Sequence, residues 1–165
     1  TLFNLLGPLT NPASAPNQVV GVYGREWVEP IAHVLSQLGS HHVLVVHSDD
    51  GLDEISLSAP TYVAELNNNK VTTYTIEPSD FGFGVQPLSS ICVKNADESL
   101  STMLSVLDGE PSPARDIVLL NSGAAIYVAG IASSLTEGVD SARRAIDSGE
   151  SKRRFHRLVA MSTSF

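Results

Sequence analysis

The 165-residue sequence contains one cysteine, Cys92, and this scarcity already limits what the chain can be. A single cysteine excludes an internal disulfide and fits a reducing compartment. The sequence also lacks an apolar run of about 18 residues, the length that a membrane span needs. It has no secretory signal with a basic start and an apolar stretch. These absences predict a cytoplasmic protein that does not associate with a membrane.

Basic residues are also few, with 10 Lys and Arg against 18 Asp and Glu and a formal net charge of −8. This balance argues against general nucleic-acid binding, which requires a positive surface for phosphates. Apolar residues make up 42% of the chain and charged residues 17%. Those proportions are typical of a folded soluble domain, and the length allows a sizeable core. We therefore predict one domain over residues 1–165.

Several common catalytic motifs are missing. There is no G-x-S-x-G sequence of a hydrolase nucleophile. The glycines of "FGFG" at 81–84 have neither dinucleotide-binding nor P-loop spacing. The histidines show no metal-ligand spacing and are interpreted as structural or surface residues. A phosphate ligand normally needs a cradle of backbone amides, and the sequence offers no obvious one.

Apolar segments alternate between strand and helix patterns in the first half of the chain. Residues 18–24 and 41–48 are short apolar runs that predict buried strands, and residues 26–38 between them have helical spacing. Together they predict a right-handed parallel βαβ unit. Residues 61–66 and 70–78 flank three asparagines and predict a β-hairpin or meander.

The second half of the chain predicts mainly helices. The expected helices are 97–107, one that begins at Pro113 after an N-capping Ser112, one that is capped by Thr136 and ends near Gly149, and a last one over 150–162 with Phe155, Leu158 and Val159 facing inward. The fold class that follows is α/β, with a mixed, largely parallel central sheet flanked by helices.

The stretch "SDDGLDEIS" at 48–56 places four carboxylates within six positions. Such a stretch is either a solvated surface loop or a cation site. It directly follows a predicted strand, and ligands of parallel sheets bind at the carboxyl ends of strands. Oxygen ligands without cysteine favour Mg²⁺, or Mn²⁺ as an alternative. Asp53 and Glu54, which follow the turn, are the better candidate ligands, whereas Asp49 and Asp50 either serve the turn itself or act on the ion through water.

A second candidate site is "NLLGPLTNP" at 4–12. It is either a helix end followed by a loop, or an apolar wall with exposed backbone. In the second interpretation Gly7 lets a flat ligand approach closely, Pro8 offers a rigid face, and Asn4 adds an amide.

Three stretches, "TLFNLLGPLTNPA" (1–13), "VLVVHSDDGLDEIS" (43–56) and "LNSGAAIYVAG" (120–130), together resemble the C-terminal half of anthranilate phosphoribosyltransferases. The resemblance implies a phosphoribosyltransferase/nucleoside-phosphorylase-like α/β domain. It also implies that this chain is the C-terminal part of a longer two-domain enzyme and lacks the N-terminal helical domain. The abrupt apolar start without Met fits that expectation. Such enzymes are expected to be homodimers.

The activity that the resemblance implies is transfer of the phosphoribosyl group from phosphoribosyl pyrophosphate (PRPP) to anthranilate, in tryptophan biosynthesis. It assigns Asp53 and Glu54 to the metal and Gly7 and Pro8 to the anthranilate channel, with Asn4 included by adjacency. It assigns no catalytic residue to this chain, so the chain by itself is expected to be inactive.

Two alternatives remain open. A pyrimidine nucleoside phosphorylase resembles this family in architecture, but its phosphate chemistry does not need a carboxylate-bound metal. A non-catalytic paralogue that binds nucleic acid or another protein is the other alternative, and the acidic net charge disfavours it.

Overall fold

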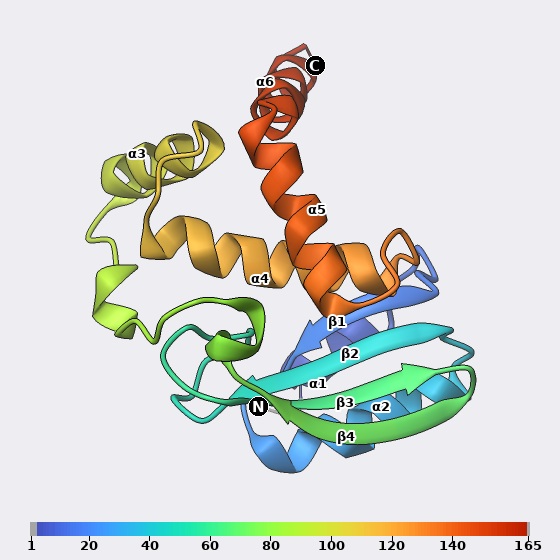
Figure 1. The fold of residues 1–165 in the computed structure, drawn as a ribbon. Helices are drawn as coiled ribbons and strands as arrows, with labels where there is room; N and C mark the ends of the chain where they lie inside the picture. The colour runs from blue at the N-terminus through green and yellow to red at the C-terminus, as the bar shows by residue number, and fades with distance from the viewer. Residues whose placement is uncertain (1–2, 165) are drawn as a thin grey trace.

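The computed structural model describes the backbone of residues 3–164 and the side chains of residues 6–164. Four strands form one sheet in the order β1-β2-β3-β4, with helices on both faces (Figure 1). The strands are β1 (Asn17–Gly21), β2 (His42–Ser48), β3 (Thr61–Asn67) and β4 (Lys70–Ile76). The helices are α1 (Phe3–Leu9), α2 (Val28–Gln37), α3 (Ala96–Leu107), α4 (Pro113–Val128), α5 (Leu135–Asp147) and α6 (Glu150–Ser162), with 3-10 turns η1 (Arg25–Trp27), η2 (Pro78–Phe81) and η3 (Leu88–Ser90). The α/β class is as predicted.

The prediction of a largely parallel sheet is wrong. β1 and β2 run parallel, but β2 with β3 and β3 with β4 are antiparallel. The connections explain the difference. A parallel pair needs a crossover, which α2 supplies between β1 and β2. The loop 49–60 and the turn at Asn68 and Asn69 instead return the chain directly to the neighbouring strand.

The predicted β-hairpin is confirmed as β3 and β4, whose pairing runs to Asn67 and Lys70 beside the turn. The two turn residues have positive φ, 51° at Asn68 and 61° at Asn69. Two-residue hairpin turns with the favoured twist need positive φ at both positions, and asparagine adopts this conformation more readily than most residues.

β2 lies in the centre of the core, and its four apolar residues from Val43 to Val46 are at most 1% exposed. Because side chains alternate along a strand, Leu44 and Val46 pack with residues of α4 and α5, whereas Val43 and Val45 pack with residues of α2. A strand covered on both faces has a continuous apolar run, as the sequence shows. This burial fixes the point at which β2 ends and the acidic loop begins.

Helices α4 and α5 cross at two glycines. A Cβ added at Gly123 would lie 2.6 Å from the backbone nitrogen of Val139, and one at Gly138 would lie 2.2 Å from the Gly123 carbonyl oxygen. Only glycine at both positions allows the two backbones to approach this closely. The crossing holds α4 firmly over the sheet.

Two predictions about the helices are wrong, one about the N-cap of α5 and one about the buried face of α6. Ser112 caps α4 as predicted, accepting a hydrogen bond from the Arg115 amide at 3.2 Å. The cap of α5 is Ser134, not Thr136, and its hydroxyl accepts from the Glu137 amide at 3.2 Å. None of the residues of α6 is buried. Phe155 is half-buried, but Leu158 is 65% and Val159 43% exposed, so the prediction of an inward-facing stripe is wrong for those two residues.

Figure 1 shows why α6 has so little cover: it continues beyond α5, away from the sheet. None of the described helices combines the length and apolar character needed to cross a membrane.

Candidate functional site

The acidic loop, residues 49–58, leaves the end of β2. β1 and β2 are parallel, so their carboxyl ends lie at the same edge of the sheet. Asp50 and Gly51 form a tight turn, in which the Gly51 amide donates to the Ser48 carbonyl at 2.9 Å and the Ser48 amide donates to the Leu52 carbonyl at 2.9 Å. Gly51 has a φ of 90°, a conformation that glycine adopts without strain.

The first two carboxylates, Asp49 and Asp50, accept hydrogen bonds from the chain itself. Asp50 accepts hydrogen bonds from the Leu52 amide at 3.1 Å and from the Ser56 hydroxyl at 2.6 Å. Burial raises the pKa of Asp50, but these hydrogen bonds outweigh burial and hold the pKa below its ordinary value. Asp49 accepts from the Tyr62 hydroxyl at 3.0 Å. Asp50 therefore stabilises the turn, and Asp49 ties the start of that turn to β3.

Asp53 and Glu54 differ from those two. Both are exposed, and within residues 6–164 neither side chain has a hydrogen bond or an ion pair. No described basic side chain neutralises them. The described residues also contain no group of three acidic, histidine or cysteine side chains that would enclose an ion. Two free carboxylates suit Mg²⁺, which commonly takes one or two protein carboxylates and completes its shell with water and substrate phosphates.

The backbone of this acidic pair is held although its side chains are free. The Ile55 amide donates to Oδ1 of Asn121 at 3.0 Å, and Nδ2 of Asn121 donates back to the Ile55 carbonyl at 2.9 Å. On the β1 side, a Cβ added at Gly21 would lie only 1.6 Å from the Asp53 carbonyl oxygen. The loop therefore packs directly on the backbone of β1, at a place where no side chain fits.

The second predicted site is described in part. The side chain of Asn4 lies outside the described residues. Gly7 is exposed, and a Cβ added there would meet no described atom within 4 Å. The chain's own packing therefore does not require glycine at this position. Pro8 is half-buried near the end of α1 and lines a pocket of about 350 Å³.

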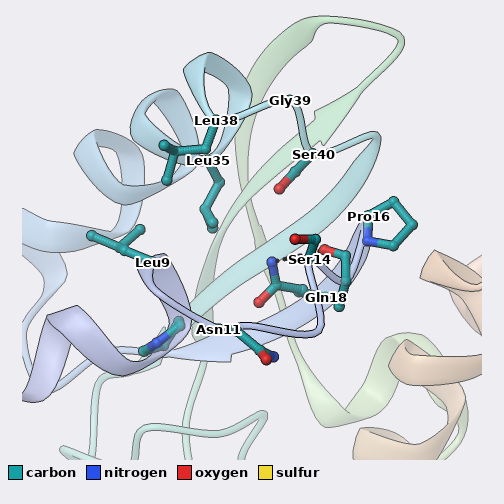
Figure 2. A pocket seen from close by; sticks show the side chains of 11 residues that line it. Leu9, Asn11, Ser14, Pro16, Gln18, Leu35, Leu38, Gly39 and Ser40 are labelled. Atoms are coloured by element: carbon teal, nitrogen blue, oxygen red, sulfur yellow. Dashed lines mark hydrogen bonds between the residues drawn. The ribbon is translucent and has the colours of Figure 1, made fainter.

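Figure 2 shows this pocket between α1, α2 and the start of β1. Leu9, Leu35 and Leu38 form an apolar side, while Asn11, Ser14, Gln18 and Ser40 contribute amides and hydroxyls. Its lining within the described part of the chain carries no charged side chain. The described lining of the pocket therefore offers no cation for a carboxylate ligand.

The described residues do not bring the two predicted sites into one pocket. Gln18 and Ser40 lie where β1 begins and just before β2, whereas Asp53 and Glu54 follow the opposite end of β2. The rise along β2 between those ends is on the order of 20 Å. The assignment of Gly7, Pro8 and Asn4 to a substrate stays a prediction.

A second carboxylate site lies on the α4 face of the sheet, around Glu65 of β3. Its Oε1 accepts from Nε2 of His42 at 2.9 Å and from the Tyr127 hydroxyl at 2.7 Å, and its Oε2 accepts from the Tyr74 hydroxyl at 2.8 Å. The Glu65 side chain is only 12% exposed. Burial raises its pKa, but the bonds from Tyr127, Tyr74 and His42 outweigh burial and lower it. Burial and the hydrogen bond to Glu65 raise the pKa of Tyr127 to about 12.

Sequence reasoning missed Asn121 and Gly21. Each residue has a sequence feature that could have identified it as structurally important. Asn121 is a polar residue within the apolar run "IVLLNSGAAIYV", where a partner is required if the residue is buried. Gly21 is a lone glycine inside a short apolar strand, a feature that often marks a close backbone approach. Neither signal identifies the partner, because both partners come from distant parts of the chain.

The sequence matches the family model described as "Glycosyl transferase family, a/b domain" over residues 1–152. Among curated relatives, the anthranilate phosphoribosyltransferase of Thioalkalivibrio sulfidiphilus (strain HL-EbGR7) is 57% identical over 164 residues, which is 99% of this chain and 48% of that protein. The chain spans about half the length of the curated relatives it matches.

Solved structures agree. The crystal structure of anthranilate phosphoribosyltransferase from Thermus thermophilus is 40% identical with a TM-score of 0.88, covering 97% of this chain and 47% of that one. The Saccharomyces cerevisiae enzyme in complex with PRPP and Mg is 29% identical with a TM-score of 0.84, and covers 100% and 48%. The same yeast enzyme in complex with 4-fluoroanthranilate is 28% identical with a TM-score of 0.86, and also covers 100% and 48%. This chain belongs to the glycosyl transferase family and carries its a/b domain.

Proposed function

We propose that the full-length protein transfers the phosphoribosyl group of PRPP to the amine of anthranilate, the reaction of tryptophan biosynthesis. In this proposal the present chain supplies a divalent-cation site at Asp53 and Glu54 and part of the anthranilate channel at Gly7 and Pro8. The remainder of the active site belongs to a helical domain that this chain does not include.

The observation that carries the proposal is the contrast within the acidic loop. Asp53 and Glu54 are exposed and unpaired among the described residues, while their backbone packs on Gly21 at the Asp53 carbonyl and is held by Asn121 at Ile55. Free carboxylates on a backbone that other segments hold in place favour a cation site over a solvated surface loop, because a solvated loop does not need its backbone fixed. The 57% identity to a named anthranilate phosphoribosyltransferase supports the same reaction.

The chemistry is a displacement at the anomeric carbon of ribose. The bond from that carbon to the anthranilate nitrogen forms, the bond to the pyrophosphate oxygen breaks, and negative charge develops on the leaving group, while the nitrogen loses one proton to solvent. A bound divalent cation neutralises that charge and improves pyrophosphate as a leaving group. Asp53 and Glu54 hold the negative charge that attracts the cation, and without the cation they repel the substrate. Positioning and electrostatics account for the rate.

The acceptor side of the proposal concerns Gly7 and Pro8. Anthranilate is flat, and the missing side chain at Gly7 allows an aromatic ring to approach the backbone closely. The open space around Gly7 among the described residues supports this role, because packing within the chain gives no other reason for a glycine there.

The test uses the full-length protein and measures the consumption of anthranilate with PRPP during a Mg²⁺ titration. Changing Asp53→Asn together with Glu54→Gln should reduce turnover by roughly two or more orders of magnitude and weaken the Mg²⁺ dependence. The matched control is Asp97→Asn with Glu98→Gln, a second adjacent acidic pair in the first turn of α3. It changes the net charge equally and should leave the titration unchanged.

The outcomes separate the alternatives. An unchanged Mg²⁺ titration in the first variant would remove the metal role from this pair. Phosphorolysis of a pyrimidine nucleoside by the unaltered protein, without anthranilate consumption, would indicate the phosphorylase alternative. The absence of both activities would indicate a non-catalytic paralogue.

A further inference from the structure

Asn121 lies in the middle of α4 and contacts the acidic loop across a sequence separation of 66 residues. Its side-chain amide faces the peptide groups of one residue, accepting from the Ile55 amide at 3.0 Å and donating to the Ile55 carbonyl at 2.9 Å. The second hydrogen of Nδ2 is donated to the Ile117 carbonyl, in its own helix, at 3.1 Å. All three contacts fix the orientation of the amide, since a flipped amide would place donor against donor and acceptor against acceptor.

The residue that Asn121 holds directly follows Glu54. Ile55 is 3% exposed and belongs to the core that includes residues of α4. Within the pair, the Asp53 carbonyl packs against Gly21 of β1. The hydrogen bond from the Ser56 hydroxyl to Asp50 closes the loop around the pair. The backbone of Asp53 and Glu54 is therefore held at the Asp53 carbonyl and at Ile55, while their side chains remain free among the described residues.

The support for Asn121 is itself rigid. Two residues further along α4, Gly123 packs against the backbone of α5 at Gly138 and Val139. This close crossing restrains the backbone of α4 near Asn121, which limits how far the base of its side chain can shift.

We propose that Asn121 is a positioning residue for the divalent-cation site, holding the backbone of Asp53 and Glu54 in the arrangement that binds the ion. This inference rests on the proposed function, because it takes the acidic pair to be the cation ligand. The physical reason is pre-organisation: a loop that is already ordered loses less conformational entropy when the ion binds. Partners that orient metal ligands typically change metal affinity by about 10- to 100-fold when they are removed.

The experiment uses the full-length protein with Mn²⁺ as the probe, because bound and free Mn²⁺ are distinguished by electron paramagnetic resonance. Mn²⁺ is titrated in the presence of PRPP for the unaltered protein, Asn121→Ala and Asn121→Asp. Both variants should bind Mn²⁺ about 10- to 100-fold more weakly. Asn121→Asp keeps the size and one acceptor but cannot donate to Ile55, so it remains informative if Asn121→Ala does not fold. Ser122→Ala, the next residue on α4, is the control and should bind Mn²⁺ normally.

Steady-state kinetics separate positioning from mere stability. With saturating Mg²⁺, Asn121→Ala should raise the KM for PRPP more than it lowers kcat, because the loop is reordered once the ion and substrate are bound. A fall in melting temperature with Mn²⁺ affinity unchanged within about twofold would show that Asn121 only stabilises the fold, and would overturn the inference.

A different result would contradict the proposed function itself: the Asp53→Asn and Glu54→Gln double variant would then bind Mn²⁺ as the unaltered protein does. Weak binding in the double variant with normal binding in both Asn121 variants would overturn the positioning role alone.

Discussion

Glu65 on β3 and the pair Asp53 and Glu54 on the acidic loop are carboxylates of the same chain with opposite surroundings. Glu65 is 12% exposed and accepts hydrogen bonds from His42, Tyr74 and Tyr127. Asp53 and Glu54 are exposed and have no partner among the described residues. In the first case the protein supplies the donors. In the second it holds the backbone and leaves the side chains free.

A carboxylate that receives hydrogen bonds from the protein itself is structural, whereas one without such donors is free to bind a cation. The presence or absence of donors is therefore a better indicator of a cation site than the clustering of acidic residues. A buried carboxylate without partners is strongly destabilising, so a sheet face can contain Glu65 only if donors surround it. An exposed carboxylate has no such requirement. When its backbone is nevertheless held in place, as by Asn121 and Gly21, the free side chains are available to a ligand.

The strongest test of the comparison is removal of Glu65. Glu65→Ala leaves the hydroxyls of Tyr74 and Tyr127 and the ring of His42 without their acceptor, and should lower the free energy of unfolding by about 2–4 kcal/mol. Glu54→Ala, at an exposed position, should change it by no more than about 0.5 kcal/mol. Denaturant unfolding of the full-length variants measures both. If Glu65→Ala leaves stability unchanged and instead alters the Mg²⁺ dependence of turnover, the structural role of Glu65 is contradicted.

A second test concerns the close contact beneath the acidic pair. Gly21→Ala places a Cβ at the position of the Asp53 carbonyl oxygen, so the loop must move. We expect a loss of about 1–3 kcal/mol in unfolding free energy, together with weaker Mg²⁺ activation. Gly7→Ala is the control for packing, since a Cβ there meets no described atom within 4 Å. It should leave stability unchanged or slightly higher, because alanine favours a helix more than glycine does. Equal destabilisation by both substitutions would contradict the assigned contact.

Glu65 should also influence how stability falls at low pH. The pKa of Glu65 lies below its ordinary value of 4.5, because the hydrogen bonds from Tyr127, Tyr74 and His42 outweigh the raising effect of burial. The unfolded chain therefore binds this proton more readily than the folded one. Stability from Glu65 is present above pH 4.5 and is lost as the pH falls through its lower folded pKa. Melting temperatures measured from about pH 7 to pH 3 should fall less steeply in Tyr127→Phe, which removes one donor. An identical acid limb in that variant would contradict the role of Tyr127.

The smallest expected effect belongs to Asp49, which lies between the two extremes. It is exposed but accepts one hydrogen bond from the Tyr62 hydroxyl at 3.0 Å. Tyr62→Phe removes that donor and keeps the ring, over which the guanidinium of Arg25 lies at 3.5 Å. Because the bond is exposed, we expect a change of at most about 1 kcal/mol in unfolding free energy and little change in Mg²⁺ activation. A large loss of Mg²⁺ activation would place Asp49 with the metal pair instead of with the turn.

Local patterns predicted most of the elements because those elements follow from local chemistry. The buried run at Val43–Val46, the hairpin at Asn68 and Asn69, and the Ser112 cap each depend on residues within a few positions. The direction of β3 against β2 does not. It depends on how the loop 49–60 returns, and the sequence of a loop without a helix or a short turn specifies that weakly. The exposure of α6 is likewise not a local property, because apolar residues at helical spacing predict a buried face only where another element covers it, and the described chain leaves Leu158 65% exposed.

Composition and local pattern establish which residues carry charge, which strand is buried on both faces, and that an adjacent acidic pair follows that strand. Folding establishes that Asp50 closes the turn while Asp53 and Glu54 stay free, and that Asn121 and Gly21 hold their backbone. These features depend on contacts between segments far apart in the chain, up to 66 residues for Asn121 and Ile55. Local sequence specifies conformation through steric and hydrogen-bond preferences of neighbouring residues, and it contains no direct information about partners brought together by folding.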